Sequence, residues 1–344
     1  MELIPGLPVE EKNISINLWV TSACNFLCSY CYEGDKKSDV FLDEKSADKI
    51  VDFIHKQCLE KGVKTLGLCF HGGEPMLNAH VIKYVVDLIR SANIIEKMFT
   101  AVTTNCYFYD ETITDYISQL TVSIDGTRKA HDINRVDKGG NPTYDRCIAN
   151  AKKYLEKDPS VRLRMVVTPN NVKYLFEGVK ELIEIGFKLI VPGLDHYSDL
   201  WTDALMETYY EQMVKIREYL RENMLIDVKV AGLNVKITEK EACRVGCDGY
   251  QIDADGKIYS CVFVVREPYY CIGDIENGFD EEKIAELNRI GEKKVEECKG
   301  CGNYRYCVTN RCLLLNKQLT GDYYTPSPVI CAEENVKLRL KGIL

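Results

Sequence analysis

The sequence predicts an α/β protein in which a partial (β/α)6, TIM-like barrel is followed by a small cysteine-rich region. Two observations indicate this fold class. Short apolar runs alternate with helical stretches over the first two thirds of the chain, and cysteines become dense in the last third. Alternating strands and helices are typical of parallel strands joined by right-handed crossovers. Six such units are too few for a complete eightfold barrel, so we expect an open one.

The strands expected in the barrel are short β-branched or apolar runs. They cover residues 15–21, 65–70, 100–105, 120–125, 162–168 and 188–193. The helices expected to connect them cover residues 43–61, 78–91, 110–117, 143–157, 171–185 and 202–222. Asp43 is a suitable N-cap for the first of these helices. Apolar side chains recur with a helical period after Asn171, which supports the fifth helix.

The pattern changes after about residue 230, so we expect two domains, 1–230 and 231–344. Strands become short in the second domain, and Asp255-Gly256 predicts a hairpin turn between two of them. Cysteines and polar turns are frequent there. A small, loop-rich region of this kind usually depends on bound metal for its fold.

Composition excludes several classes of protein. The chain has 344 residues and a formal net charge of -8. It has no long Lys/Arg tract, which argues against a nucleic-acid partner, and no apolar stretch long enough to span a membrane. Its first residues lack the apolar core of a signal peptide, so we expect a cytoplasmic protein. In a reducing compartment, most of the 16 cysteines are expected to be metal ligands or core residues rather than disulfides.

The first cysteine cluster directly follows the first expected strand. Cys24, Cys28 and Cys31 have the spacing C-x3-C-x2-C. Three thiolates can hold three irons of a four-iron cluster and leave the fourth iron open for another ligand. A loop after a barrel strand also lies on the face where such barrels form active sites. The alternative is a zinc loop, but no fourth ligand is near, because His55 lies inside an expected helix.

This motif, with Tyr30 directly before its last cysteine, resembles that of the radical S-adenosylmethionine (SAM) superfamily, and the resemblance covers essentially the whole chain. Gly72-Gly73-Glu74-Pro75 follows the second strand and resembles the family's GGEP motif. The resemblance implies that Glu74 and strand-edge carbonyls receive the SAM amino group. It also implies that Tyr30 packs near the adenine and that Arg135 binds the SAM carboxylate as a bidentate partner. The implied cofactor-binding residues are Tyr30, Gly72, Gly73, Glu74, Pro75, Thr104, Asn105, Ser123, Asp125, Arg135, Val166 and Thr168. Strand-end Ser and Thr residues also commonly cap the next helix, which is the competing interpretation for several of them.

The later cysteines resemble a SPASM domain, which binds two auxiliary four-iron clusters. The resemblance assigns one cluster to Cys243, Cys247, Cys261 and Cys312, and the other to Cys298, Cys301, Cys307 and Cys331. The chain has four residues rather than three before Cys312, a small departure from the family pattern. The alternative is a pair of zinc ribbons, since C-x2-C also suits zinc. The cysteines left over are Cys58, Cys69, Cys106, Cys147 and Cys271; the first four are expected to pack in the core, and the role of Cys271 stays open.

The resemblance implies an enzyme, a radical SAM oxidoreductase that modifies peptides or proteins. Its cofactors would be SAM and three [4Fe-4S] clusters, one binding SAM and two auxiliary. Its partners would be a peptide or protein substrate and a flavodoxin- or ferredoxin-type electron donor, with no nucleic acid and no membrane. Many such maturases carry an N-terminal peptide-recognition domain. Residues 1–13 are too few for one, which suggests a separate leader-peptide-binding partner.

Two peptide reactions compete. Anaerobic sulfatase maturases, which make formylglycine, carry an Asp base directly after the cysteine of the G-x4-C unit. Val262 occupies that position after Cys261 and cannot accept a proton, which weakens the formylglycine interpretation. We therefore favour a thioether or other crosslink in a ribosomally made peptide. A SPASM enzyme acting on a small molecule and a non-catalytic, zinc-stabilised scaffold are the alternatives outside peptide maturation.

Overall fold

A single curved sheet organises the molecule. The computed structural model describes residues 13–36, 38–233, 245, 249–293, 295–307, 309 and 311–342. Within this part of the chain, the strands form an 11-stranded sheet in the order β11-β10-β9-β8-β1-β2-β3-β4-β5-β6-β7. The strands are β1 (Asn13–Thr21), β2 (Thr65–Gly72), β3 (Lys97–Thr104), β4 (Gln119–Ser123), β5 (Arg162–Val167), β6 (Leu189–Leu194), β7 (Lys229–Val230), β8 (Gly249–Ile252), β9 (Lys257–Tyr259), β10 (Cys271–Asp274) and β11 (Gly278–Phe279).

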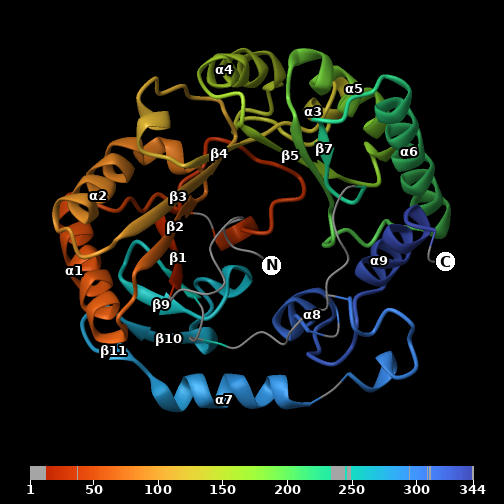
Figure 1. Cartoon of the computed structure of the whole chain (residues 1–344). Coiled ribbons are helices and arrows are strands. Elements are labelled where there is room, and N and C mark those ends of the chain that lie inside the picture. The colour runs from red at the N-terminus through yellow and green to blue at the C-terminus, as the bar shows by residue number, and fades with distance from the viewer. Residues whose placement is uncertain are drawn as a thin grey trace.

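The helices lie on the outer side of this sheet and extend around it (Figure 1). They are α1 (Glu44–Lys61), α2 (Ala79–Ser91), α3 (Arg128–Asp132), α4 (Tyr144–Lys157), α5 (Leu175–Ile185), α6 (Asp203–Glu222), α7 (Glu281–Glu292), α8 (Leu313–Thr320) and α9 (Pro328–Leu340). Among the described residues, none of these helices is both long and apolar enough to cross a membrane.

The expected partial barrel is confirmed. Strands β1 to β7 pair in parallel, each with the next in the chain. Side chains alternate along a strand, so one face packs on the helices and the other lines the barrel interior. In β1, Ile16, Leu18 and Val20 are buried in the main helix-side core, whereas Trp19 belongs to a separate apolar cluster on the inner face. The expected N-cap also forms, because Asp43 accepts a hydrogen bond from the N–H of Ser46 at 2.7 Å.

One expected helix is wrong. Residues 110–117 contain only a short 3-10 turn, Ile113–Asp115. The Asp110 carboxylate accepts hydrogen bonds from both the N–H and the hydroxyl of Thr112, each at 2.9 Å. Such local side-chain bonds compete with helical hydrogen bonds and stabilise a turn instead. The same carboxylate pairs with Lys83 of α2 at 2.8 Å, which fixes the loop against the neighbouring helix.

The C-terminal region continues the barrel sheet. Strand β8 pairs in parallel with β1, and the buried Asn17 amide donates to the Gln251 side chain at 2.7 Å across this pair. The predicted hairpin is confirmed, since β8 and β9 are antiparallel and Gly256 takes a positive φ of 83° at the turn. At the other end of the sheet, α9 packs against α6, so the C-terminal region meets both edges of the barrel (Figure 1).

A buried ion-pair cluster fastens the two regions together. The Arg266 guanidinium donates to both carboxylate oxygens of Asp253, at 2.8 and 2.7 Å, and to Glu33 at 3.0 Å. Glu33 lies two residues after the first cysteine cluster, and it and Asp253 are only 4% and 5% exposed. Nearby, Lys36 pairs with Glu267 at 2.6 Å. The loop after the first cluster is thus anchored on the C-terminal region.

We predict that Arg266→Met lowers the free energy of unfolding by about 3 to 5 kcal/mol, because it removes the arginine that pairs with two buried carboxylates. Urea unfolding under anaerobic conditions, followed by circular dichroism, measures the change. The matched control is Lys49→Met, which breaks an exposed pair with Glu276 across the same two regions. We expect that control to change stability by less than about 1 kcal/mol. Equal effects of the two substitutions would contradict a structural role for the buried cluster.

Candidate active site

The first cysteine loop is fixed by backbone hydrogen bonds to a later loop. The N–H groups of Leu27 and Ser29 donate to the carbonyls of Val136 and Asn134, at 2.9 and 3.0 Å. The N–H of Lys138 donates back to the carbonyl of Asn25 at 3.2 Å. This pairing positions a segment that carries three cysteines outside any disulfide, of which Cys24 is buried and Cys28 and Cys31 are partly buried.

These thiols suit a cluster better than a single ion. Among the described residues, no three Cys, His, Asp or Glu side chains converge on the site of one metal ion. In a four-iron cluster each cysteine binds its own iron, so the thiols stand farther apart than around one zinc ion. Three cysteines in one short loop are compatible with a four-iron cluster that has one open iron.

The Gly72-Gly73 backbone passes against the end of β1 with no room for a side chain. A Cβ on Gly72 would stand 2.3 Å from the carbonyl oxygen of Thr21, and one on Gly73 would stand 2.4 Å from that of Ala23. The N–H of Glu74 donates to the same Ala23 carbonyl at 2.8 Å. The glycines are therefore required by close backbone approach, and they hold Glu74 beside the cysteine loop.

The Glu74 carboxylate is almost completely buried and accepts three hydrogen bonds. The donors are the Thr104 hydroxyl at 2.7 Å and the N–H groups of Asn105 at 2.6 Å and Met76 at 3.0 Å. Burial raises the pKa of Glu74, while these donors act in the opposite direction. The Asn105 side chain reaches Asn25 in the cysteine loop at 2.8 Å. Thr104 and Asn105 thus position Glu74 and the loop, and Pro75 begins a 3-10 turn (Pro75–Asn78) behind them.

Tyr30, Asp125 and Arg135 form a second buried group against the cysteine loop. The Tyr30 hydroxyl donates to Asp125 at 2.7 Å and accepts from Arg135 at 2.6 Å. Burial opposes the Arg135 charge, but Tyr30, Cys28 and Asp125 together hold its pKa well above the ordinary value. Its Nε atom is buried and has no hydrogen-bond partner among the residues that the structure describes. That donor remains free to bind an anionic group, which fits the carboxylate of SAM.

The remaining expected contacts surround Asp125. The N–H of Val166 donates to Asp125 at 2.9 Å, and the N–H of Asp125 donates to Nδ1 of His131 at 3.3 Å. Burial, followed by the charge of Arg135, holds the pKa of His131 well below its ordinary value, so the ring is neutral and accepts this bond. Thr168 accepts from Asn134 at 3.3 Å, and Ser123 ends β4 on the inner face.

The C-terminal cysteines gather as two groups. The pKa of Cys298 is raised to about 11, first by burial and then by the thiols of Cys331, Cys307 and Cys301. These four cysteines therefore lie near one another. The pKa of Tyr197 is raised to about 12, first by burial and then by the charges of Cys261, Glu267, Glu33 and Cys312. Cys261 and Cys312 therefore lie near the Tyr197 ring. Cys243 and Cys247 lie outside the described residues.

The residue after Cys261 lies in an apolar setting. Val262 is buried in a cluster with Trp19, Tyr259 and Val265, and the Trp19 ring stacks on His71 at a centroid distance of 4.5 Å. Burial lowers the pKa of His71 to about 4, so this imidazole is neutral at ordinary pH. The side chain at position 262 therefore has neither a proton-accepting atom nor a polar surrounding.

The leftover cysteines have different surroundings. Cys58, Cys106 and Cys147 are buried in the helix-side core, as expected of packing residues. Cys69 instead lies between the core residues Leu68 and Phe70 on β2, and so faces the barrel interior. Burial raises its pKa to about 12. Cys271 is partly buried against the Val262 cluster, and its thiol donates to the carbonyl of Gly273 at 3.3 Å.

The sequence reasoning missed several polar residues around this site. They include Arg162 and Arg164 of β5 and the Glu33–Arg266–Asp253 cluster. The sequence did contain a signal for the arginines, because β5 reads RLRMVV and places two charges at alternate positions of an otherwise apolar strand. No local sequence pattern could indicate the ion-pair cluster, since Glu33 and Arg266 are 233 residues apart in the chain.

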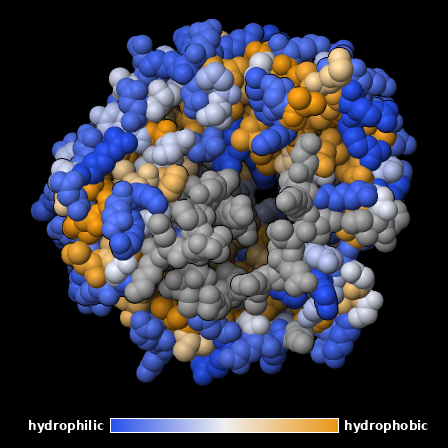
Figure 2. All heavy atoms as spheres, viewed as in Figure 1, coloured by the Kyte–Doolittle hydropathy of each residue, from blue (hydrophilic) through white to orange (hydrophobic). Residues whose placement is uncertain are grey.

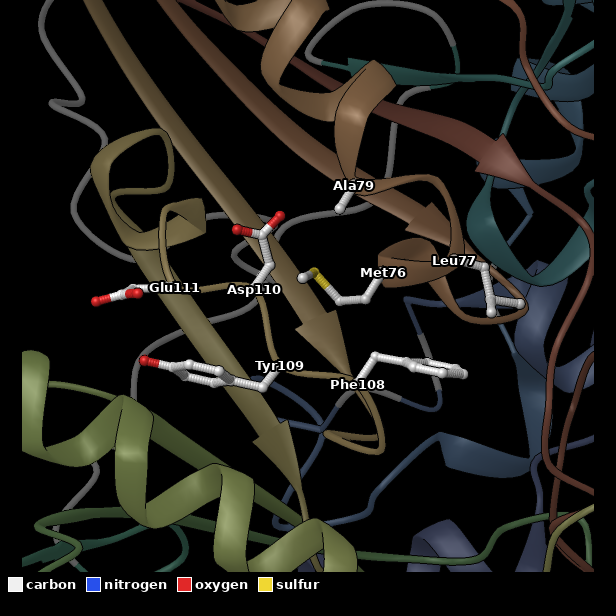
Figure 3. A pocket seen from close by; sticks show the side chains of 7 residues that line it. All are labelled: Met76, Leu77, Ala79, Phe108, Tyr109, Asp110 and Glu111. Atoms are coloured by element: carbon white, nitrogen blue, oxygen red, sulfur yellow. The ribbon is translucent and has the colours of Figure 1, made fainter.

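A cavity of about 500 Å³ opens beyond this site, between the turn after the Gly-Gly-Glu-Pro segment and the loop after β3. Figure 3 shows the side chains that surround it, those of Met76 and Leu77 from the turn and those of Phe108 to Glu111 from the loop. Of the residues that line it, Met76 and Leu77 contact Glu74, each through its backbone N–H. The cavity therefore lies outside the group of cysteines, Glu74 and Arg135.

The geometry described above agrees with comparisons with known proteins. Residues 20–175 match the model of the radical SAM superfamily. The chain carries a radical SAM domain. It is therefore an enzyme, and proteins of this superfamily use SAM and a [4Fe-4S] cluster.

Several relatives cover most of the chain. A cysteine-type anaerobic sulfatase-maturating enzyme of Clostridium perfringens is 23% identical over 316 residues, covering 83% of this chain and 85% of that one. The uncharacterised protein MJ0907 of Methanocaldococcus jannaschii is 28% identical over 295 residues, covering 83% and 93%. The solved structure of native anSMEcpe with bound AdoMet has a TM-score of 0.75 at 21% identity, covering 96% of this chain and 98% of that chain. Streptococcus suis SuiB bound to precursor peptide SuiA has a TM-score of 0.62 at 16% identity, covering 93% and 76%. The fold is thus shared well beyond the radical SAM domain.

We predict that Gly73→Ala weakens SAM binding at least about tenfold, a change of about 1.4 kcal/mol. The added Cβ would collide with a backbone carbonyl and move Glu74, while the helix-side core stays intact. Equilibrium dialysis with labelled SAM measures the effect, and circular dichroism checks the fold. Gly302→Ala is the matched control, because a Cβ there meets nothing within 4 Å. Normal SAM binding by the Gly73 variant would contradict the assignment of this segment.

Proposed function

We propose that the protein is a radical SAM maturase that modifies a peptide or protein. The observation that carries this proposal is the convergence of three elements: the loop of Cys24, Cys28 and Cys31, the Gly72–Glu74 segment, and the free donor of Arg135. The sulfatase-maturating relatives and the fold shared with SuiB, whose solved structure holds a precursor peptide, support a peptide substrate.

Each element has a separate task in this proposal. Cys24, Cys28 and Cys31 would hold the cluster, the Glu74 region would receive the SAM amino group, and Arg135 would bind the SAM carboxylate. When bound, the cluster supplies the electron that cleaves SAM to methionine and a 5′-deoxyadenosyl radical, which takes a hydrogen atom from the substrate. The barrel residues hold SAM and substrate in contact and exclude water.

The later cysteines would hold two auxiliary clusters. The grouping of Cys298, Cys301, Cys307 and Cys331 supports one of them. The nearness of Cys261 and Cys312 to Tyr197 supports the other, with Cys243 and Cys247 completing its ligands. Such clusters would accept the electron left on the substrate after hydrogen abstraction. The substrate then loses two electrons in all, as an oxidative crosslink requires.

A thioether or other crosslink is the reaction we favour. Formylglycine formation would need a base at position 262, and Val262 lies in an apolar cluster with Trp19 and Val265. The nearby carboxylates of Glu33 and Asp253 are paired with Arg266. A crosslink from a substrate thiol to a carbon needs no base at that position. The second candidate is formylglycine formation, which the sulfatase-maturating relatives favour.

We predict that the triple variant Cys24→Ala, Cys28→Ala, Cys31→Ala loses reductive SAM cleavage and keeps its auxiliary iron. Wild-type protein reconstituted anaerobically should hold about 12 iron atoms per chain, and the variant about 8. Iron and sulfide analysis and the yield of 5′-deoxyadenosine measure the two effects. The matched control is Cys58→Ala, which removes a core thiol and should leave cleavage unchanged. Continued 5′-deoxyadenosine formation by the triple variant would show that the catalytic cluster lies elsewhere.

We predict that cysteine-containing peptides lose two hydrogen atoms and keep their sulfur when the reconstituted enzyme acts on them. Formation of a thioether removes one hydrogen from carbon and one from the thiol, whereas conversion of cysteine to formylglycine removes the sulfur. High-resolution mass spectrometry distinguishes the products. Peptides from sulfatases and short cysteine-rich peptides should be tested side by side. A product without sulfur would favour the second candidate over the first.

A further inference from the structure

The inner face of β5 carries two arginines that the proposed function does not use. Arg162 and Arg164 alternate with Leu163 and Met165, which are buried in the helix-side core. The arginines must therefore face the interior of the barrel. Ser123 of β4 lies beside Arg164 in the sheet register, at the strand end that leads to Asp125. The two cations thus lie close to the expected SAM contacts.

The two arginines differ in their partners. Arg162 donates to the Thr121 hydroxyl at 2.9 Å. The Arg164 carbonyl accepts a hydrogen bond from the N–H of Ile124 at 3.0 Å, but its guanidinium makes no hydrogen bond or ion pair with any residue in the described part of the chain. Its guanidinium lies over Gly193 of β6, where a Cβ would stand 2.6 Å from Nη2. The glycine therefore provides the space that this side chain occupies.

The nearby carboxylates are already bound to other groups. Glu333 of α9 pairs with His196 at 2.7 Å and with Lys337 at 3.1 Å. Asp125 accepts from Tyr30 and from the N–H of Val166. The Arg164 guanidinium stays charged at neutral pH, as that of an arginine does in proteins. The Arg164 side chain is exposed to water. Figure 2 shows a hollow near the middle of the molecule in the view of Figure 1.

An unpaired, accessible guanidinium inside an active-site barrel is suited to a carboxylate ligand. SAM has one carboxylate, and Arg135, which adjoins Cys28, keeps a free buried Nε for it. We propose that Arg164, seated over Gly193, binds a carboxylate of the peptide substrate, and so selects peptides with an acidic group near the modified residue. The group is an Asp or Glu side chain or the C-terminal carboxylate. This inference rests on the proposed peptide substrate.

Selection from a pool of short random peptides tests the proposal. The pool is prepared with free and with amidated C-termini, incubated with reconstituted enzyme and SAM under anaerobic conditions, and the retained peptides are sequenced. Wild-type enzyme should enrich acidic peptides; loss of enrichment on amidation alone would assign the group to the C-terminus. Arg164→Gln should reduce the enrichment about tenfold. Gly193→Ala should reduce it as well, because the new Cβ displaces the guanidinium without removing its charge.

Matched controls separate the outcomes. Lys215→Gln removes one exposed charge from the outer helix α6 and should leave the enrichment unchanged. Arg164→Lys should keep part of it, since the charge remains while bidentate geometry is lost. Unchanged acidic enrichment in Arg164→Gln would overturn the proposal. So would a tenfold loss of SAM affinity with the peptide preference intact, because Arg164 would then serve SAM. If wild-type enzyme retains no peptide at all, the proposed peptide substrate itself is contradicted.

Discussion

The close approach of two backbone segments determines how this site is built. Gly72 and Gly73 pass against Thr21 and Ala23 at distances that exclude any Cβ. Because the second of these segments leads directly into the cysteine loop, the contact fixes Glu74 beside that loop. Thr104 and Asn105 then hold the Glu74 carboxylate from β3, and Asn105 also reaches Asn25. Three parallel strands thereby fix the position of the cysteines before any cofactor binds.

Buried charge connects this arrangement to the rest of the molecule. On one side of the loop, Tyr30 joins Asp125 and Arg135; on the other, Glu33 joins Arg266 and Asp253. A buried pair of this kind contributes little net stability compared with apolar packing, but its loss leaves an uncompensated charge. Such pairs therefore favour one relative placement of the barrel and the C-terminal region. That placement determines how Cys261 and Cys312 lie relative to Cys31.

Much of the fold could be predicted from local sequence. The strands and most helices of the barrel follow from periodicity, and Asp43 and Gly256 indicate an N-cap and a turn through their own chemistry. The helix expected at 110–117 failed because the Asp110 side chain stabilises a turn, a competition that periodicity does not register. Of the site, the motif residues were accessible through their spacing. The pairing of Glu33 with Arg266 and the space over Gly193 were not, because both depend on segments far apart in the chain.

The proposed function requires that SAM bind with its amino and carboxyl groups at the iron that the three cysteines would leave open. Electron–nuclear double resonance on the reduced protein tests this directly, using SAM labelled with 15N in the amino group and 17O in the carboxylate. Coupling of both labels to the cluster is the expected result, and it should disappear when Cys24, Cys28 and Cys31 are replaced. A reduced, intact cluster that shows no coupling to either label would contradict the site built from Glu74, Arg135 and the cysteine loop.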